Sequence, residues 1–154
     1  MDFRLAFDNS TGTADLVLTA NGDLAIDDGL ETAILISLGS DAMARADDEI
    51  PDNTADRRGW WADFITDAGV LRDETGSRLW LLDRADITPD TLRLAEQYAA
   101  ESLAWLVEDG VAESVAVEAR GMGRNGIGLG VLLNRGTARE SRFDYLWNNE
   151  GLPG

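Results

Sequence analysis

The sequence predicts an α+β fold: a small antiparallel sheet, one long helix, one shorter helix, an irregular insert and a C-terminal β-hairpin. Three observations support this class. Apolar residues alternate with other residues near the start of the chain, as in half-buried strands. Later stretches carry apolar residues at helical spacing, and a glycine-rich segment separates two more alternating runs. With 154 residues and no linker-like stretch, we expect one domain, residues 1–154.

The first half of the chain predicts a strand meander followed by the shorter helix. Alternation over Phe3–Phe7 and an Asn21-Gly22 hairpin signal predict strands within residues 2–27. Residues 27–46 carry a helical stripe, with Asp28 as N-cap and Glu31 as its capping partner. Gly39 weakens this prediction, because glycine costs about 1 kcal/mol relative to alanine inside a helix.

Residues 46–78 form the irregular insert. They hold acidic clusters, Pro51 and the stretch RRGWW at 57–61. We expect a long, partly ordered loop with one short helix. A loop of this length in a compact domain usually has a function.

The long helix has the clearest start and stop signals. Thr88 is a cap, Pro89 suits the first helical position, and Asp90 complements the positive helix end. The helix should run to about Asp109 and end at Gly110. It carries two apolar stripes, which imply two packing partners. The first comprises Leu92, Ala95, Ala99, Leu103 and Leu106, and the second comprises Leu94, Tyr98 and Trp105.

The C-terminal part predicts a hairpin over Val115–Asn134, in which Leu129, Val131 and Leu133 face Val115 and Val117. Its edge could accept a strand from another chain. Glycines at 126, 128 and 130 weaken the strand, which would suit completion by a neighbour. The tail holds a short aromatic stretch and then unravels.

Composition excludes several classes of function. The formal net charge is −16, and arginine is the only basic residue type. Such a charge repels nucleic acid and anionic membranes, so neither is an expected partner. Without cysteine or histidine the chain has no Ser-His-Asp triad and no ordinary zinc site. We expect no cofactor, no metal and no catalytic residue. A signal-peptide pattern and a bilayer-spanning apolar run are also missing, so a soluble, cytoplasmic protein is expected.

Three motifs suggest chemistry, and each has a simpler interpretation. GMGRNG at 121–126 matches a dinucleotide pattern, but a strand rather than a helix should follow it, which favours a hairpin tip. The acidic run at 47–56 resembles a calcium loop from Asp52, but Arg57 and Asp63 stand at the glycine and glutamate positions. Paired carboxylates with Trp60, Trp61 and Trp80 could serve a glycosidase, yet acidic pairs are abundant here.

The tryptophans favour a protein interface. There are five in 154 residues, and tryptophan is enriched at interfaces. Trp60 and Trp61 follow Arg57 and Arg58 in a loop, so we expect a docking anchor, with core packing as the alternative.

Three motifs occur in an order that resembles a known family. They are RRGWW at 57–61, GSRLWLLDR at 76–84 and SLAWLVEDGVAESVAVEA at 102–119. Over residues 22–135 the chain resembles the small baseplate wedge protein of Mu-like contractile-tailed phages, distantly related to the lysozyme-like small wedge subunit of larger contractile tails. One departure stands out: the distant relatives carry Glu-Pro-Arg at the end of the long helix, where this chain has Glu108, Asp109 and Gly110, so no bundle contact is carried over from that arginine.

The resemblance implies a structural subunit of the virion tail baseplate, assembled in the host cytoplasm. Its implied partners are larger wedge proteins, bound through a helical bundle, and the tail sheath protein, whose first ring it seats by strand pairing; tail tube or hub proteins remain open as contacts. Arg78 is implied to form a structural ion pair or an interface contact. The hypothesised interface residues are Arg57, Arg58, Trp60, Trp61, Arg78, Trp80, Leu94, Tyr98, Trp105, Leu129, Val131 and Leu133.

Two other functions remain open. The first is a peptidoglycan-degrading, lysozyme-like enzyme, which requires two carboxylates about 5–10 Å apart in a cleft with an aromatic wall. The second is a free-standing binding module, which would be a monomer without a strand-pairing partner.

Overall fold

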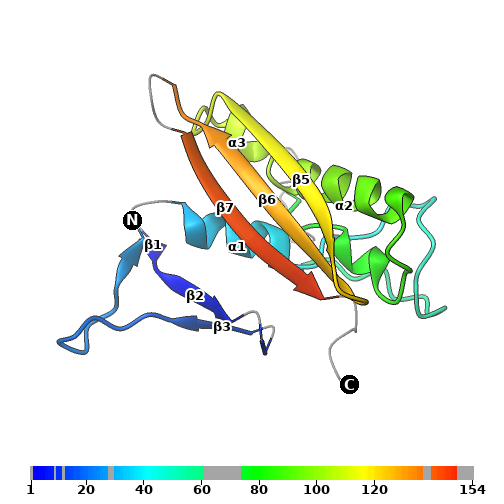
Figure 1. Cartoon of the computed structure of the whole chain (residues 1–154), viewed down its shortest axis with the longest axis horizontal. Coiled ribbons are helices and arrows are strands. Elements are labelled where there is room, and N and C mark those ends of the chain that lie inside the picture. The colour runs from blue at the N-terminus through cyan, green and yellow to red at the C-terminus, as the bar shows by residue number, and fades with distance from the viewer. Residues whose placement is uncertain are drawn as a thin grey trace, which may run out of the picture.

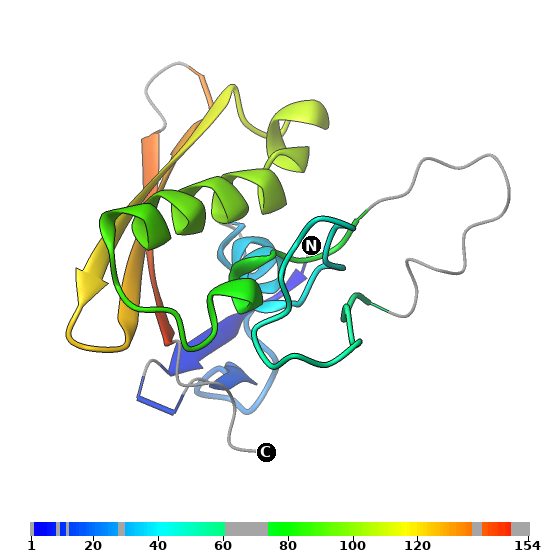
Figure 2. The same ribbon diagram turned by 90° about the vertical axis from the view of Figure 1, so that its right-hand side faces the viewer.

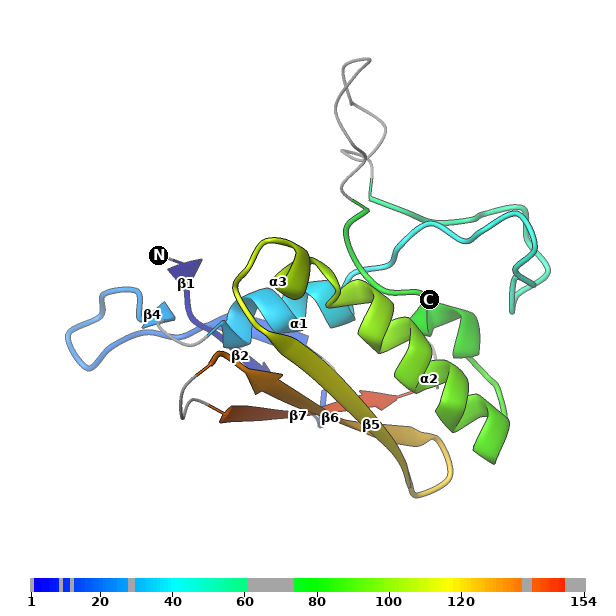
Figure 3. The ribbon, with the colours of Figure 1, turned by 90° about the horizontal axis from the view of Figure 1, so that it is seen from above.

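A three-stranded antiparallel sheet forms one layer of the protein, and α1, α2 and α3 pack on one of its faces (Figures 1 and 3). This computed structural model describes residues 2–8, 10–11, 13–27, 30–60, 74–136 and 140–148. The α+β class predicted from the sequence is confirmed. The strands are β1 (Asp2–Phe3), β2 (Leu5–Asp8), β3 (Thr13–Leu16), β4 (Ile26–Asp27), β5 (Ser114–Met122), β6 (Gly126–Asn134) and β7 (Glu140–Asn148). The helices are α1 (Glu31–Gly39), the 3₁₀ helix η2 (Leu79–Leu82), α2 (Pro89–Ser102) and α3 (Trp105–Glu108).

The N-terminal strands form the predicted meander beside α1. Strand β1 pairs with β4 and β2 pairs with β3, both antiparallel. An antiparallel bridge between Leu18 and Leu24 closes the Asn21-Gly22 turn, where Gly22 has a φ of 85°. The Thr32 hydroxyl bridges this meander and α1: Thr32 Oγ1 accepts a hydrogen bond from the Leu5 amide and donates one to the Phe3 carbonyl, each at 3.0 Å.

Replacing Thr32 by valine should therefore loosen the meander. The change keeps the shape of the side chain but leaves the Leu5 amide and the Phe3 carbonyl without this partner. We expect the free energy of unfolding to fall by about 1–3 kcal/mol, because unpaired polar groups near the interior are costly. Urea denaturation would measure this. Thr11→Val is the control, because the Thr11 hydroxyl is exposed, and it should change stability by less than about 0.5 kcal/mol. Equal effects of the two changes would contradict the attachment.

Helix α1 is shorter than the predicted 27–46, and the reason is a competing backbone partner. Its N-cap is Leu30, with a φ of 68° and no side-chain cap, while the predicted cap Asp28 lies outside the described residues. After Gly39 the chain extends, because the Ser77 amide donates to the Ser40 carbonyl at 2.8 Å and the Ala42 amide donates to the Ser77 carbonyl at 2.9 Å. Pairing with Ser77 replaces further helical turns.

The long helix begins as predicted but is bent. Thr88 caps α2 by accepting the Thr91 amide at 3.2 Å, and Pro89 occupies the first turn. The prediction of one continuous helix to Asp109 is wrong in detail, because the amides of Leu103 and Ala104 bond to carbonyls three residues back, which tightens the chain between α2 and α3. Gly110, with a φ of 70°, follows the end of α3.

The two apolar stripes of this helix both find partners inside the chain. The first stripe, with Ala95, Ala99, Leu103 and Leu106 fully buried, packs on the sheet in the main core. The second stripe meets η2 and α1: Tyr98 lies under the guanidinium of Arg78, and Trp105 donates its indole N–H to Ser37 Oγ at 3.1 Å. The two packing partners predicted from the stripes are therefore both supplied by this chain.

The C-terminal hairpin is part of a three-stranded sheet, in the order β5-β6-β7. The aromatic tail stretch that was not assigned a strand forms β7, which pairs with β6 along nine residues. Strand β6 is thus central, and the edges of the sheet belong to β5 and β7. Gly126 at the start of β6 makes room for the backbone of β5, since an added Cβ would lie 2.6 Å from the Met122 carbonyl oxygen.

Candidate partner-docking surface

The loop of residues 41–60, which we call the insert loop, lies beside η2 and the end of α1 (Figure 2). Hydrogen bonds to Ser77 hold its first residues. Gly76 is required next to it, because it has a φ of 100° and an added Cβ would lie 2.5 Å from the Ser40 carbonyl oxygen. Gly59, with a φ of 104°, approaches Met43 closely. The insert loop is therefore packed against the domain over its described residues.

Arg58 joins the insert loop to η2. Its Nη1 lies 2.8 Å from Asp41 Oδ2, and its Nη2 lies 3.6 Å from Asp83 Oδ2. Its guanidinium carbon stands 4.4 Å from the centroid of the Trp80 ring, which is a cation–π geometry. Burial raises the pKa of Asp83, against the opposing effect of the Arg58 charge. Arg58 adopts a φ of 52°, and its role in this structure is to fasten the loop.

Arg78 is buried, with 7% of its surface exposed. Its Nη1 lies 2.9 Å from both oxygens of Asp48, and its Nη2 lies 2.7 Å from Glu101 Oε2. The guanidinium also stacks 4.5 Å from the Tyr98 ring centroid. Of the two roles implied by the resemblance, the structural ion pair is present. One arginine thereby connects the insert loop to helix α2.

The contacts around Arg78, which we call the Arg78 cluster, shift the pKa values of Glu101, Arg78 and Tyr98. Burial acts to raise the pKa of Glu101, but hydrogen bonds from Arg78 and Gln97 outweigh it and hold that pKa below its usual value. Burial acts to lower the pKa of Arg78, and the bonds to Glu101 and Asp48 reverse this. Burial raises the pKa of the Tyr98 hydroxyl. The charged forms of Arg78 and Glu101 are therefore the stable ones.

Trp60 differs from Trp80 in exposure. Trp60 is 47% exposed at the end of the described part of the insert loop, whereas Trp80 is 3% exposed and donates its indole N–H to the Ala42 carbonyl at 2.8 Å. Arg57 donates to the carbonyls of Arg45 and Ala46, so its guanidinium braces the loop. Trp61 lies outside the described residues. Trp60 is therefore the large side chain that this loop offers to a partner.

The other hypothesised interface residues are placed in or against the core. Leu129, Val131 and Leu133 on β6 are fully buried, and Leu94 packs against the same core. Tyr98 is buried, while Trp105 is half-buried. The structure brings Arg58 to Trp80 and Arg78 to Tyr98, and Tyr98 shares the main core with the three β6 residues. Sequence reasoning missed the partners of the two arginines, Asp41, Asp48, Asp83 and Glu101, because no local spacing marks them.

Two of the motifs that suggested chemistry, GMGRNG and the acidic run, form turns of the backbone. GMGRNG forms the β5–β6 turn, with Gly123 at a φ of 70°, and strand β6 rather than a helix follows. In the acidic run, Asp52 Oδ1 accepts the amide and hydroxyl of Thr54, and these bonds lower the pKa of Asp52. Among the described residues no group of three or more acidic side chains is arranged to hold a metal ion. Within the same residues no helix is long and apolar enough to cross a membrane.

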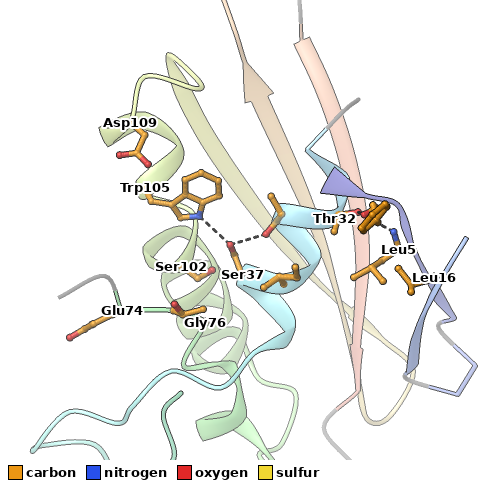
Figure 4. Close-up of a pocket in the computed structure, with 13 residues that line it drawn as sticks. Leu5, Leu16, Thr32, Ser37, Glu74, Gly76, Ser102, Trp105 and Asp109 are labelled. Carbon is orange, nitrogen blue, oxygen red and sulfur yellow. Dashed lines mark hydrogen bonds between the residues drawn. The ribbon is translucent and has the colours of Figure 1, made fainter. Parts of the chain in front are cut away.

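A pocket of about 510 Å³ lies over α1 and was not anticipated from the sequence. Figure 4 shows Trp105 and Asp109 on one side of α1, with Leu5 and Leu16 on the other. Glu74 to Gly76 complete its wall. The available signal was the apolar alternation of the N-terminal strands, from which we predicted strands but no pocket.

Comparisons with known proteins place the chain in a phage family. The family model described as phage protein GP46 matches residues 30–140. The baseplate protein gp46 of Escherichia phage Mu is 45% identical over 97 residues, which are 63% of this chain and 63% of that protein. The Mu-like prophage FluMu protein gp46 of Haemophilus influenzae is 37% identical over 149 residues, which are 96% of this chain and 98% of that protein. The chain therefore belongs to the phage protein GP46 family.

Proposed function

We propose that the chain is a structural, non-catalytic subunit of a contractile phage tail baseplate in the virion. The observation that carries the proposal is the 45% identity to a protein named as the baseplate protein of phage Mu. In this role it would assemble in the host cytoplasm, bind larger wedge proteins through a helical bundle, and seat the first sheath ring by strand pairing. Tail tube or hub proteins are further candidate contacts.

The helical contact would use the outward face of α2 and α3. Both apolar stripes have packing partners within the chain, so we assign the bundle contact to the side that faces solvent. That side carries small and apolar residues in a row, Ala100, Ala104 and Val107, with charged and polar residues around them. Small side chains let a second helix approach closely, and Trp60 on the insert loop would supply an anchor.

The strand-pairing contact would use β7. The β5 edge is partly occupied, because the Ala119 amide donates to Glu96 Oε1 at 2.9 Å. In the described part of the chain β7 is hydrogen-bonded along one side only, to β6. A strand from the sheath protein could add to its other side. The exposed pair of Arg142 and Asp144 would keep this edge from pairing indiscriminately.

Asp144→Pro should block strand addition while the domain stays folded. The Ala119 amide bonds to Glu96 and therefore points away from β6, and Ala119 lies opposite Leu129, which lies opposite Tyr145. Because amides alternate in direction along an antiparallel ladder, the Tyr145 amide points to β6. The amide of the preceding residue, Asp144, then points outward from the sheet. Proline at Asp144 then removes an outward donor and no internal one. We expect the loss of sheath attachment by co-purification, with little change in melting temperature. Asp144→Ala, which keeps the amide, is the control and should attach normally. Attachment by the proline variant would contradict pairing at β7.

The proposed function is tested by recovering the tagged chain from cells that make tails and identifying its companions by mass spectrometry. Recovery of a larger wedge protein with sheath or tube subunits is expected. A lone monomer, from cells shown to make tails, would overturn the assembly role. The enzymatic alternative would then be tested by cell-wall digestion, with Glu74→Gln and Asp109→Asn as variants, because these two acids share a pocket with Trp105.

A further inference from the structure

The pocket over α1 continues into an exposed apolar surface on the meander. Phe3 and Leu16 line the pocket and are each about half exposed. Phe3 lies opposite Ile26 in the β1–β4 pair, and Leu18 is bridged to Leu24. All five of these side chains are classed as exposed, although they are large and apolar. We call this surface, together with Ile36 and Trp105, the N-terminal groove.

The N-terminal groove is too extended for a small ligand alone. The pocket itself, about 510 Å³, would fit a small molecule. However, the exposed apolar side chains of Leu18, Leu24 and Ile26 on the meander lie outside the lining of the pocket. Several large apolar side chains exposed beside a pocket are typical of a protein interaction site. The groove therefore fits a chain segment that fills the pocket and extends over the meander.

The charge around the pocket identifies the kind of segment. The charged residues that line it are Glu74 and Asp109, both acidic (Figure 4). Arg4 does not line the pocket, and its guanidinium lies 3.6 Å from the Glu31 carboxylate. The whole chain has a formal charge of −16, so a second copy would be repelled, whereas a basic segment would be attracted.

We propose that the N-terminal groove binds an amphipathic segment of another baseplate protein, with apolar side chains flanked by lysine or arginine. The apolar side chains would enter the pocket beside Ile36 and Trp105, and the basic flanks would face Glu74 and Asp109. That the partner is a baseplate protein rests on the proposed function, whereas the binding site rests on the residues of the groove. It is a separate contact from the α2–α3 face and the β7 edge.

Photo-crosslinking inside tail-producing cells tests this proposal. The photoreactive residue benzoylphenylalanine replaces Ile36, which is 47% exposed in the groove, and in parallel cells it replaces Trp60 or Met122. Met122 is the matched control, because it is 55% exposed and lies at the β5–β6 turn away from the groove. Mass spectrometry then identifies the crosslinked peptide. From position 36 we expect a segment of another tail protein with clustered apolar residues and a net positive charge. From position 122 we expect no such peptide.

The outcomes separate the groove from the baseplate role. A crosslink from position 36 to a second copy of this chain, or to a segment without positive charge, overturns the proposal. So does the absence of a crosslink at 36 while Trp60 crosslinks to a baseplate protein, and in that case the proposed function stands. If no position crosslinks to any tail protein, both fail. As a second measurement, Ile36→Asp should reduce particle yield at least tenfold, whereas Met122→Asp should leave it unchanged.

Discussion

Replacing Arg78 by methionine is expected to destabilise the domain by about 3–5 kcal/mol. The substitution leaves the carboxylates of Asp48 and Glu101 without their shared cation, in a site where the arginine side chain is 8% exposed and Asp48 11%. Breaking one side of a buried ion pair has this cost, because the remaining charge is poorly solvated. It also removes the stacking on Tyr98. Urea denaturation followed by circular dichroism would measure the loss.

Arg45→Met is the matched control for the Arg78 substitution. Arg45 pairs with the same Glu101 oxygen at 3.4 Å, but its side chain is 58% exposed. A pair of that kind contributes no more than about 1 kcal/mol. Arg78→Lys should fall between the two variants, since lysine keeps the charge but not the bidentate geometry. If Arg45→Met were as damaging as Arg78→Met, burial would not be the source of the effect.

The same cluster should make stability depend on pH in the acid range. The pKa of Glu101 is lowered in the folded state, so its contribution is complete above its unfolded value of about 4.5 and is lost as the pH falls through the lower folded value. Arg78→Met removes the main hydrogen bond that lowers this pKa. The variant should therefore lose less stability on acidification than the native chain.

Elements that depend on a few neighbouring residues, such as helix starts and turns, could be predicted from the sequence. Thr88-Pro89 predicted the start of α2, because the cap and the fixed proline φ act within one turn. Asn21-Gly22 and the glycines near 123 predicted turns, because glycine adopts a positive φ without steric cost. The α+β class and the hairpin followed from these signals and from periodicity.

Pairing between distant segments could not be predicted in this way. Strand β7 alternates aromatic and charged residues, yet in isolation nothing specified that it would lie beside β6. Arg78 was singled out by its motif, but its partners are 30 and 23 residues away, with no spacing rule to find them. The groove was missed for a related reason: alternation shows that a strand has an apolar face, but not whether its own fold covers that face.

Trp60→Ala is expected to weaken assembly far more than folding. An exposed tryptophan on a braced loop is typical of an interface hot spot, where truncation costs 2 kcal/mol or more, about 30-fold in affinity. The side chain is about half exposed, so the free energy of unfolding should change by less than about 1 kcal/mol. Co-purification with the larger wedge protein and thermal denaturation would measure the two effects separately. The double variant with Trp60→Ala and Trp61→Ala tests the docking anchor that the sequence predicted for this tryptophan pair.

Trp80→Ala should instead weaken folding, so it serves as the comparison for Trp60→Ala. Trp80 is buried, carries the Arg58 guanidinium on its ring and bonds to the Ala42 carbonyl, so its removal should cost about 3–5 kcal/mol of folding free energy. Any loss of assembly in that variant should follow the fraction unfolded. If Trp60→Ala also lost folding and assembly in proportion, the ring would be a core residue of the insert loop. A loss confined to assembly would instead assign the RRGWW stretch to docking, because only a partner can then be the missing contact.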